Sequence, residues 1–146
     1  INVIVQKGVI AYCPNREVKE EELKSFTELF SSCGSLYLIE ESLMDIFTAL
    51  AGSGPAFVFK FISALILSGI RGGLSYELSR GIVLDTILGS CEVLKELGGH
   101  PEEWITKVTS PAGTTIEGIK VLEDRGFSGI VMECIYKSWE RSKKIT

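Results

Sequence analysis

The run from Pro55 to Ile70 constrains the fold more than any other feature, because almost all of its side chains are apolar. A helix that is apolar on every side has to be surrounded, either by protein or by lipid. The run carries Lys60 and is shorter than the roughly 20 residues that a membrane span requires. We therefore expect a buried helix in a protein that does not enter a membrane.

Only helices of modest length are available to surround this one. Helical spacing predicts that residues 41–146 are almost wholly helical, with a first helix at about 42–50. The predicted helix starts are Ser53 or Gly54, Ser75, Pro101, Thr114 and Ser128, and the predicted stops are Gly72–Gly73, Gly98–Gly99 and Gly126. Burying one Leu, Ile or Phe side chain is worth about 1.5–3 kcal/mol, so a bare flank would leave several such contributions unrealised. A second copy of the chain is the natural cover, and we expect a homodimer.

Residues 1–40 have a different pattern. The segments Ile1–Val5, Gly8–Cys13 and Leu36–Ile39 are rich in β-branched and aromatic residues, which predicts three strands. Between the second and third, apolar residues recur at helical spacing from Leu23 to Cys33. Strand, helix, strand is the order of an α/β layer, but so few strands cannot close a core. We expect this segment to be the tail of a sheet that begins upstream.

Composition excludes several classes of function. A chain of 146 residues suits one domain, and its net charge of −4 without a basic stripe argues against nucleic acid. The four cysteines (Cys13, Cys33, Cys91, Cys134) are scattered, and the lone His100 cannot complete a metal site with them. We expect no metal and buried, reduced thiols, which fits a cytoplasmic protein.

The hexapeptide Ser110–Thr115 ends one helix and begins another. The segment from Thr114 to Glu117 has the form of a capping box, with Thr114 as the N-cap. A helix start preceded by small residues exposes backbone N–H groups and the positive end of the helix dipole, which suits a carboxylate or a phosphate. The hydroxyls of Ser110, Thr114 and Thr115 add donors at the same place. An ordinary turn and helix cap is the alternative interpretation.

Two long motifs carry a resemblance to a known family. The segment Val108–Ile119 resembles the signature of pyrroline-5-carboxylate reductases, and Ala49–Phe57 resembles a second block of the same family. Their order and separation fit, and the resemblance extends from Gly8 to Lys143. The family normally has glycine where this chain has Ala112, which leaves close backbone approach in doubt at that position.

The resemblance implies a substrate, a cyclic imine bearing a carboxylate, and residues to hold it. Thr115 would offer its hydroxyl to the ring nitrogen and Thr114 its backbone N–H. The implied substrate-binding residues are Ser110, Gly113, Thr114 and Thr115, and the implied cofactor-proximal residues are Glu41 and Lys107. A solvated surface carboxylate is the alternative for Glu41.

The resemblance also implies the domain plan. Residues 1–40 would be the tail of a truncated Rossmann-type domain that binds NADPH or NADH. Residues 41–146 would be an all-helical dimerisation and substrate-binding domain, similar to the C-terminal domain of 6-phosphogluconate dehydrogenase. We expect a mostly α protein with a short α/β remnant, forming a homodimer or a higher oligomer of dimers.

The implied activity is reduction of 1-pyrroline-5-carboxylate to L-proline with NAD(P)H. The chain has no G-x-G-x-x-G motif after a strand, so we expect it to be inactive alone. No catalytic acid or base stands out, which suits reduction of an already protonated imine, and His100 is expected to cap a helix or lie on the surface. A non-catalytic dimerisation module and a related two-domain dehydrogenase for another small acid are the alternatives.

Overall fold

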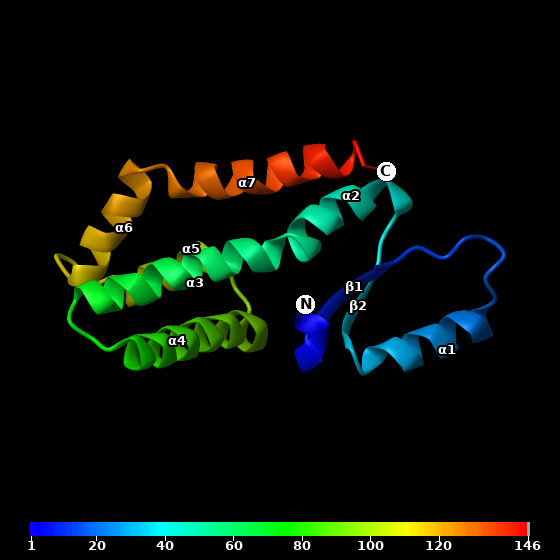
Figure 1. Cartoon of the computed structure of the whole chain (residues 1–146), viewed down its shortest axis with the longest axis horizontal. Helices are drawn as coiled ribbons and strands as arrows, with labels where there is room; N and C mark the ends of the chain where they lie inside the picture. Colours follow the sequence, from blue (N-terminus) through cyan, green and yellow to red (C-terminus); the bar gives the residue numbers. More distant parts are fainter. Residues whose placement is uncertain (146) are drawn as a thin grey trace. The chain divides into compact units, whose positions relative to one another are not determined.

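Helices dominate the chain from Glu41 onward in the computed structural model, which describes residues 1–145 (Figure 1). Contacts divide the chain into two compact units, one formed by Ile1–Phe57 with the chain from Glu133 onward, the other by Val58–Met132. In chain order the elements are η1 (Asn2–Val5), β1 (Gly8–Tyr12), α1 (Glu20–Ser31), β2 (Gly34–Leu38), η2 (Glu41–Leu43), α2 (Met44–Phe47), η3 (Thr48–Gly52), α3 (Gly54–Arg71), α4 (Tyr76–Leu97), α5 (Pro101–Val108), α6 (Thr114–Asp124) and α7 (Phe127–Ser142).

The first unit contains the expected strand, helix, strand segment. Strands β1 and β2 pair in parallel, from Gly8 opposite Gly34 to Tyr12 opposite Leu38, and α1 connects them. Phe26 of α1 packs on Tyr12 with ring centroids 5.6 Å apart, because a helix that joins parallel strands lies against the sheet. A Cβ at Gly34 would lie 2.1 Å from the Gly8 carbonyl oxygen, so the two strands meet there at a distance that only glycine allows.

The predicted strand at Ile1–Val5 is wrong. These residues form the 3₁₀ helix η1, closed by hydrogen bonds from Ile4 N to Ile1 O (3.1 Å) and from Gln6 N to Val3 O (2.9 Å). The preference of β-branched residues for strands depends on packing against a neighbouring strand. The sheet that the described residues form has two strands, and η1 lies outside it.

Helix α3 begins at Gly54, within the predicted start at Ser53 or Gly54, but Ser53 does not cap it. Ser53 keeps helical backbone angles, φ −84° and ψ −29°, where a capping residue would be extended. Its N–H donates to the Thr48 carbonyl at 3.0 Å, five residues back, so η3 is a π-helical turn. Pro55 has no N–H to offer the widened turn, and Ala56 N instead bonds to Ser53 O at 3.0 Å. The chain therefore passes from α2 into α3 without leaving helical geometry.

In the second unit α3 and α4 approach closely through small residues. Ser79 of α4 is 1% exposed, and a Cβ at Gly69 of α3 would lie 2.5 Å from its Oγ. The hydroxyl of Ser79 has no hydrogen-bond partner among the residues that the structure describes. Ser75 caps α4 as predicted, its Oγ accepting from Leu78 N at 3.2 Å.

The boundaries of the later helices agree only in part with those predicted from the sequence. Gly98 ends α4 with φ 66°, and the indole N–H of Trp104 donates to its carbonyl at 2.8 Å. Helix α7, however, begins at Phe127 rather than after Ser128, because Ile130 N already bonds to Gly126 O at 3.0 Å. The left-handed Gly126 (φ 66°) turns the chain directly into the last helix.

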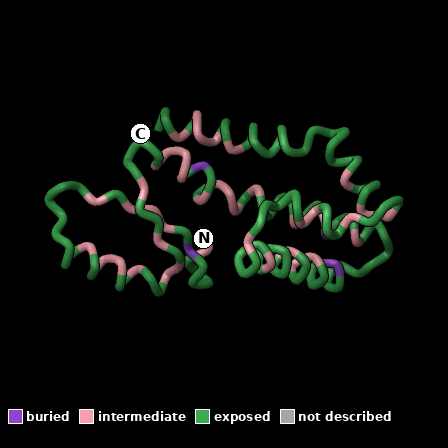
Figure 2. Tube along the Cα trace, turned by 180° about the vertical axis from the view of Figure 1, so that it is seen from behind, coloured by how far each residue is buried: buried purple, intermediate pink, exposed green. Residues whose placement is uncertain are grey.

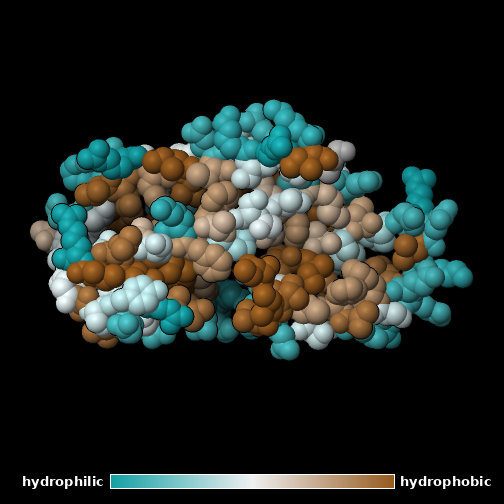
Figure 3. Space-filling model, viewed as in Figure 1, coloured by the Kyte–Doolittle hydropathy of each residue, from teal (hydrophilic) through white to brown (hydrophobic). Residues whose placement is uncertain are grey.

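The described chain buries very little of its apolar surface by itself. Its only buried hydrophobic side chains are Ala49 and Ile66 (Figure 2). On α3, Phe59 is 54% exposed and Leu67 61%, and hydrophobic side chains occupy much of the face in Figure 3. The expected burial of this helix is therefore not supplied by the chain's own helices.

The helical stretch Glu41–Arg71 is long and apolar enough to cross a membrane by length and composition, a criterion that core helices of soluble proteins also meet.

The cysteines were predicted to be buried. Cys13, Cys91 and Cys134 are exposed and Cys33 is half-buried, since the surfaces that carry them are uncovered in the single chain. All four are free thiols.

The contact between Gly69 and Ser79 gives a stability prediction. Gly69→Ala should lower the free energy of unfolding by about 1–2 kcal/mol, because overpacking costs about 1–3 kcal/mol and outweighs alanine's gain of roughly 1 kcal/mol in helix propensity. Urea denaturation measures this change.

The matched control is the double variant Gly69→Ala/Ser79→Ala, which removes the clashing hydroxyl and should recover most of the loss. Ser79→Ala alone should be neutral or stabilising, since it deletes an unpaired buried hydroxyl. A Gly69→Ala protein as stable as the parent would contradict the close approach of α3 and α4.

Candidate functional site

The segment between α5 and α6 carries the predicted site and is held by its own hydrogen bonds. Thr109 N bonds to Thr106 O at 3.3 Å, and Thr109 Oγ1 bonds to Ile105 O at 2.7 Å. After Thr109 the chain turns back, with Gly113 N donating to Ser110 O at 3.0 Å. The α5–α6 loop, residues 109–113, is therefore tied to α5 at one end and closed on itself at the other.

This turn explains the sequence Ser110–Gly113. Pro111 occupies its second position, and Ala112, in the third, has φ +55°. Proline followed by a residue of positive φ is the mark of a type II turn, whose third position favours glycine. Ala112, where the resembled family normally has glycine, therefore adopts the left-handed conformation at a cost of about 1–2 kcal/mol. Close approach is instead required one residue later, because a Cβ at Gly113 would lie 2.2 Å from Ser110 Oγ.

The predicted capping box at Thr114 is wrong by one residue. Gly113 is the N-cap of α6, with φ −82° and ψ 174°, and no side chain caps the helix among the described residues. The type II turn delivers the chain to α6 at Gly113, so Thr114 already lies in the first helical turn. Its hydroxyl is consequently not engaged as a cap.

The start of α6 therefore presents donors without side-chain competition. The first N–H groups of any helix have no acceptor within it. Thr115 is half-buried, whereas Ser110 and Thr114 are exposed. The loop thus brings Ser110, Gly113, Thr114 and Thr115 to one helix N-terminus, which favours a negatively charged group such as a carboxylate.

The two predicted cofactor-proximal residues belong to other elements of the chain. Lys107 belongs to α5, where its ammonium stands over the Trp104 ring at 3.8 Å from the centroid, a cation–π contact. Glu41 is an exposed residue at the start of η2, in the first compact unit. His100 caps α5, its Nδ1 accepting from Glu102 N at 3.3 Å, as one of its two expected roles.

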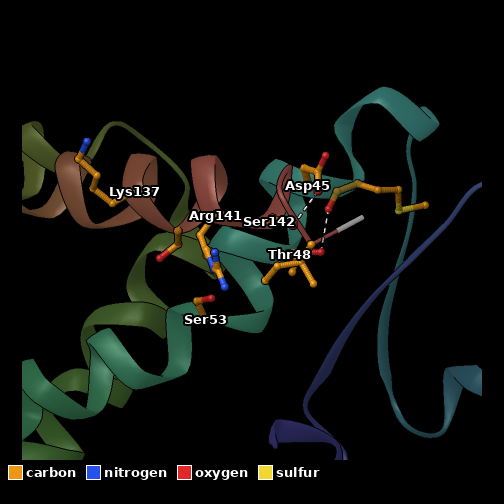
Figure 4. Close-up of a pocket in the computed structure, with 9 residues that line it drawn as sticks. Asp45, Thr48, Ser53, Lys137, Arg141 and Ser142 are labelled. Atoms are coloured by element: carbon orange, nitrogen blue, oxygen red, sulfur yellow. Dashed lines mark hydrogen bonds between the residues drawn. The ribbon is translucent and has the colours of Figure 1, made fainter.

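A cavity of about 620 Å³, lined by both polar and apolar side chains, lies in the first unit, where α7 meets α2 and η3 (Figure 4). Ser142 Oγ donates to Asp45 Oδ1 at 2.6 Å. Arg141 extends from α7 toward Ser53, while the Lys137 ammonium bonds to Glu140 at 3.0 Å. That hydrogen bond raises the pKa of Lys137 above its usual value, so the side chain is fully charged at neutral pH.

Sequence reasoning missed this cavity. The bond between Asp45 and Ser142 joins residues 97 apart, and neither residue stands in a motif that announces a partner. The only local signal of the cavity is that Lys137, Arg141 and Ser142 lie within six residues near the end of the last helix and can share one side of it. Over residues 1–145, no group of three His, Cys, Asp or Glu side chains is arranged to hold a metal ion.

Comparison with known families decides the membership of the chain. The family model described as pyrroline-5-carboxylate reductase dimerisation matches residues 41–145. The chain belongs to the pyrroline-5-carboxylate reductase family. The resemblance seen in the two motifs is thereby confirmed.

Curated relatives agree. The chain is 57% identical over 145 residues to the pyrroline-5-carboxylate reductase of Aquifex aeolicus, a match covering 99% of this chain and 55% of that one. It is 38% identical over 141 residues to the enzyme of the same name from Synechocystis, covering 97% and 53%. The chain thus spans about half the length of these relatives.

Solved structures of the family share the fold. Pyrroline carboxylate reductase of Plasmodium falciparum, crystallised with NADP bound, superposes with a TM-score of 0.94 at 38% identity, covering 98% of this chain and 58% of that one. The Streptococcus pyogenes enzyme gives 0.94 at 35% identity, covering 98% and 55%. The predicted fold class, mostly helical with a short α/β segment at the start, is confirmed.

The backbone of Ala112 yields a prediction. Ala112→Gly should raise the free energy of unfolding by about 0.5–1 kcal/mol, because glycine relieves the left-handed strain and loses part of that gain to unfolded-state entropy. Thermal and chemical denaturation measure it.

Lys24→Gly is the control, since exposed Lys24 lies inside α1 with helical backbone. It should destabilise by about 1 kcal/mol. Equal destabilisation by both substitutions would show that Ala112 is not strained.

Proposed function

We propose that this chain is the substrate-binding and dimer-forming part of an oxidoreductase that reduces 1-pyrroline-5-carboxylate to L-proline with NAD(P)H. The observation that carries the proposal is the start of α6, where a type II turn presents unpaired N–H groups beside the half-buried Thr115. A carboxylate is the charge that such a helix start stabilises. The names of the relatives supply the substrate to which that carboxylate would belong.

The roles proposed for the loop residues follow from their positions. The substrate carboxylate would receive hydrogen bonds from the backbone N–H of Thr114 and from the hydroxyl of Ser110. Gly113 would let the Ser110 hydroxyl lie against the start of α6, because a Cβ at this position would lie 2.2 Å from Ser110 Oγ. Thr115 would place its hydroxyl against the ring nitrogen. Glu41 and Lys107 are proposed to lie near the cofactor.

In this reaction the loop residues would orient the substrate and would not transfer a proton. The imine carbon accepts a hydride and the carbon–nitrogen double bond becomes single, with the electron pair passing to a nitrogen that is already protonated. A reduced nicotinamide supplies the hydride when it is bound. Holding the ring at both its carboxylate and its nitrogen would convert binding energy into alignment of the reacting carbon.

The nicotinamide cofactor is proposed from the relatives and not from a site in this chain. A solved relative binds NADP. Residues 1–145 contain no glycine-rich turn between a strand and a helix of the kind that holds a dinucleotide. We assign residues 1–40 to the tail of a Rossmann-type domain and residues 41–146 to the helical domain, supported by the parallel β1–β2 pair and by the family match from residue 41.

We further propose that a second subunit covers α3, and that this homodimer is the unit from which any larger oligomer is built. Support comes from the dimerisation family match and from the exposed apolar side chains of α3. Protein rather than lipid would then surround the apolar stretch Glu41–Arg71. The four free thiols support a reducing, cytoplasmic location.

Leu67→Asp should weaken the dimer at least about tenfold, because burying one leucine is worth about 1.5–3 kcal/mol and the substitution adds a charge to the contact. Light scattering across a dilution series measures the change. Leu29→Asp on α1 is the matched control, being 70% exposed against 61% for Leu67. A parent protein that stays monomeric at micromolar concentration would refute the proposed dimer.

Thr115→Val in the enzyme expressed from its complete gene should lower kcat/KM for pyrroline-5-carboxylate about tenfold to more than a hundredfold. The substitution keeps the shape of the side chain and deletes a hydroxyl whose bond to a charged group is worth about 1.5–3 kcal/mol. Steady-state kinetics with NADH and NADPH measure it, and also give the cofactor preference.

Thr114→Val is the control for the same helix turn. Its exposed hydroxyl caps nothing and only its backbone N–H is assigned a role, so kcat/KM should stay near that of the parent. Parental kinetics for Thr115→Val would remove Thr115 from the site.

A further inference from the structure

The last turn of α5 leaves one carbonyl without its ordinary partner. In a continuing α-helix the N–H of Thr109 would bond to the carbonyl of Ile105, four residues back. Here Thr109 N bonds to Thr106 O at 3.3 Å instead, as the helix tightens before it ends. The carbonyl of Ile105 therefore needs another donor.

The side chain of Thr109 supplies that donor. Its Oγ1 reaches the Ile105 carbonyl at 2.7 Å, and the side chain is half-buried. The backbone of Thr109 is extended, with φ −103° and ψ 106°, so the hydroxyl bond is made by a residue that has already left the helix. Thr109 thus stabilises the last turn of α5 and also fixes the direction in which the chain leaves the helix.

The direction in which the chain leaves Thr109 determines where Ser110–Gly113 and the start of α6 lie. Ser110 is the next residue, and its carbonyl closes the type II turn at Gly113. Gly113 is in turn the N-cap of α6. Only four residues separate Thr109 from Thr114, so a change in the direction of departure is passed on to the first N–H groups of α6.

We propose that Thr109 is a positioning residue of the substrate site: by bonding to the Ile105 carbonyl it sets the α5–α6 loop so that the N–H groups at the start of α6 meet the substrate carboxylate. This inference rests on the proposed function of the loop. Thr109 itself touches no substrate. Its hydroxyl acts through the backbone of Ser110–Gly113.

The test compares three variants of the enzyme expressed from its complete gene. Thr109→Val keeps the β-branched shape and deletes the hydroxyl, and it should raise KM for pyrroline-5-carboxylate about three- to thirtyfold while kcat changes less than about twofold. Thr109→Ser retains the hydroxyl and should restore KM to within about twofold of the parent.

Thr106→Val is the matched control on the same helix. Thr106 Oγ1 also bonds four residues back, to Glu102 O at 3.0 Å, but from an exposed position inside α5. It is one turn before the loop, so its KM should remain parental. A KM for Thr109→Val equal to that of Thr106→Val, or a Thr109→Ser enzyme as impaired as Thr109→Val, would overturn the proposal.

Amide hydrogen exchange separates this proposal from the proposed function. Thr109→Val should speed exchange in the segment 110–115 relative to Thr106→Val, a result that requires no substrate. If the parent enzyme fails to reduce pyrroline-5-carboxylate, the proposed function fails, yet exchange still tests the positioning role. Unchanged exchange in that segment would overturn the role of Thr109 whatever the activity, and a lowered melting temperature with parental KM would reduce it to a purely structural bond.

Discussion

The structure depends on a helix that its own chain cannot cover. Helix α3 is apolar around its circumference, and among the described residues it buries only Ile66. Hydrophobic burial is the main favourable term in folding and in association, so a helix that the described residues leave uncovered favours contact with further protein. The second subunit proposed above would supply that cover, and the family model, described as pyrroline-5-carboxylate reductase dimerisation, supports this proposal.

The candidate site occupies a different kind of structure from this helix. The α5–α6 loop is short, and its shape comes from hydrogen bonds at Thr109 and Gly113 rather than from apolar contacts. A loop of this kind can hold donors in fixed directions, which is what recognition of a small charged substrate requires. The strain at Ala112 belongs to the same arrangement, since a type II turn needs a positive φ at that residue.

Much of the fold could be predicted because it depends on local signals. Ser75 and Gly98 mark the ends of α4 with a cap and a left-handed glycine, and both were found from sequence. The strand predicted at Ile1–Val5 failed because β propensity has no effect without a neighbouring strand. The π turn at Thr48–Gly52 had no recognisable signature before Pro55.

The candidate site was predictable in its residues but not in its register. Proline, glycine and hydroxyl residues located the loop, whereas the capping-box pattern placed the start of α6 one residue late. The pattern could not reveal that Ala112 would adopt a positive φ and so complete the turn earlier. Nor could any local pattern find the cavity at Asp45 and Ser142, because that contact spans most of the sequence.

Because Asp45 bonds to Ser142, the order of synthesis determines which of the two units can be completed first. The first unit consists of Ile1–Phe57 and the chain from Glu133 onward, so the second unit is inserted within it. Synthesis proceeds from the N-terminus at about 5–20 residues per second, and a segment still inside the ribosome cannot contribute contacts. Residues 58–132 can therefore be complete while Asp45 still awaits its partner. The unit that begins first is finished last, and during that interval a nascent chain exposes the surface that α7 later covers.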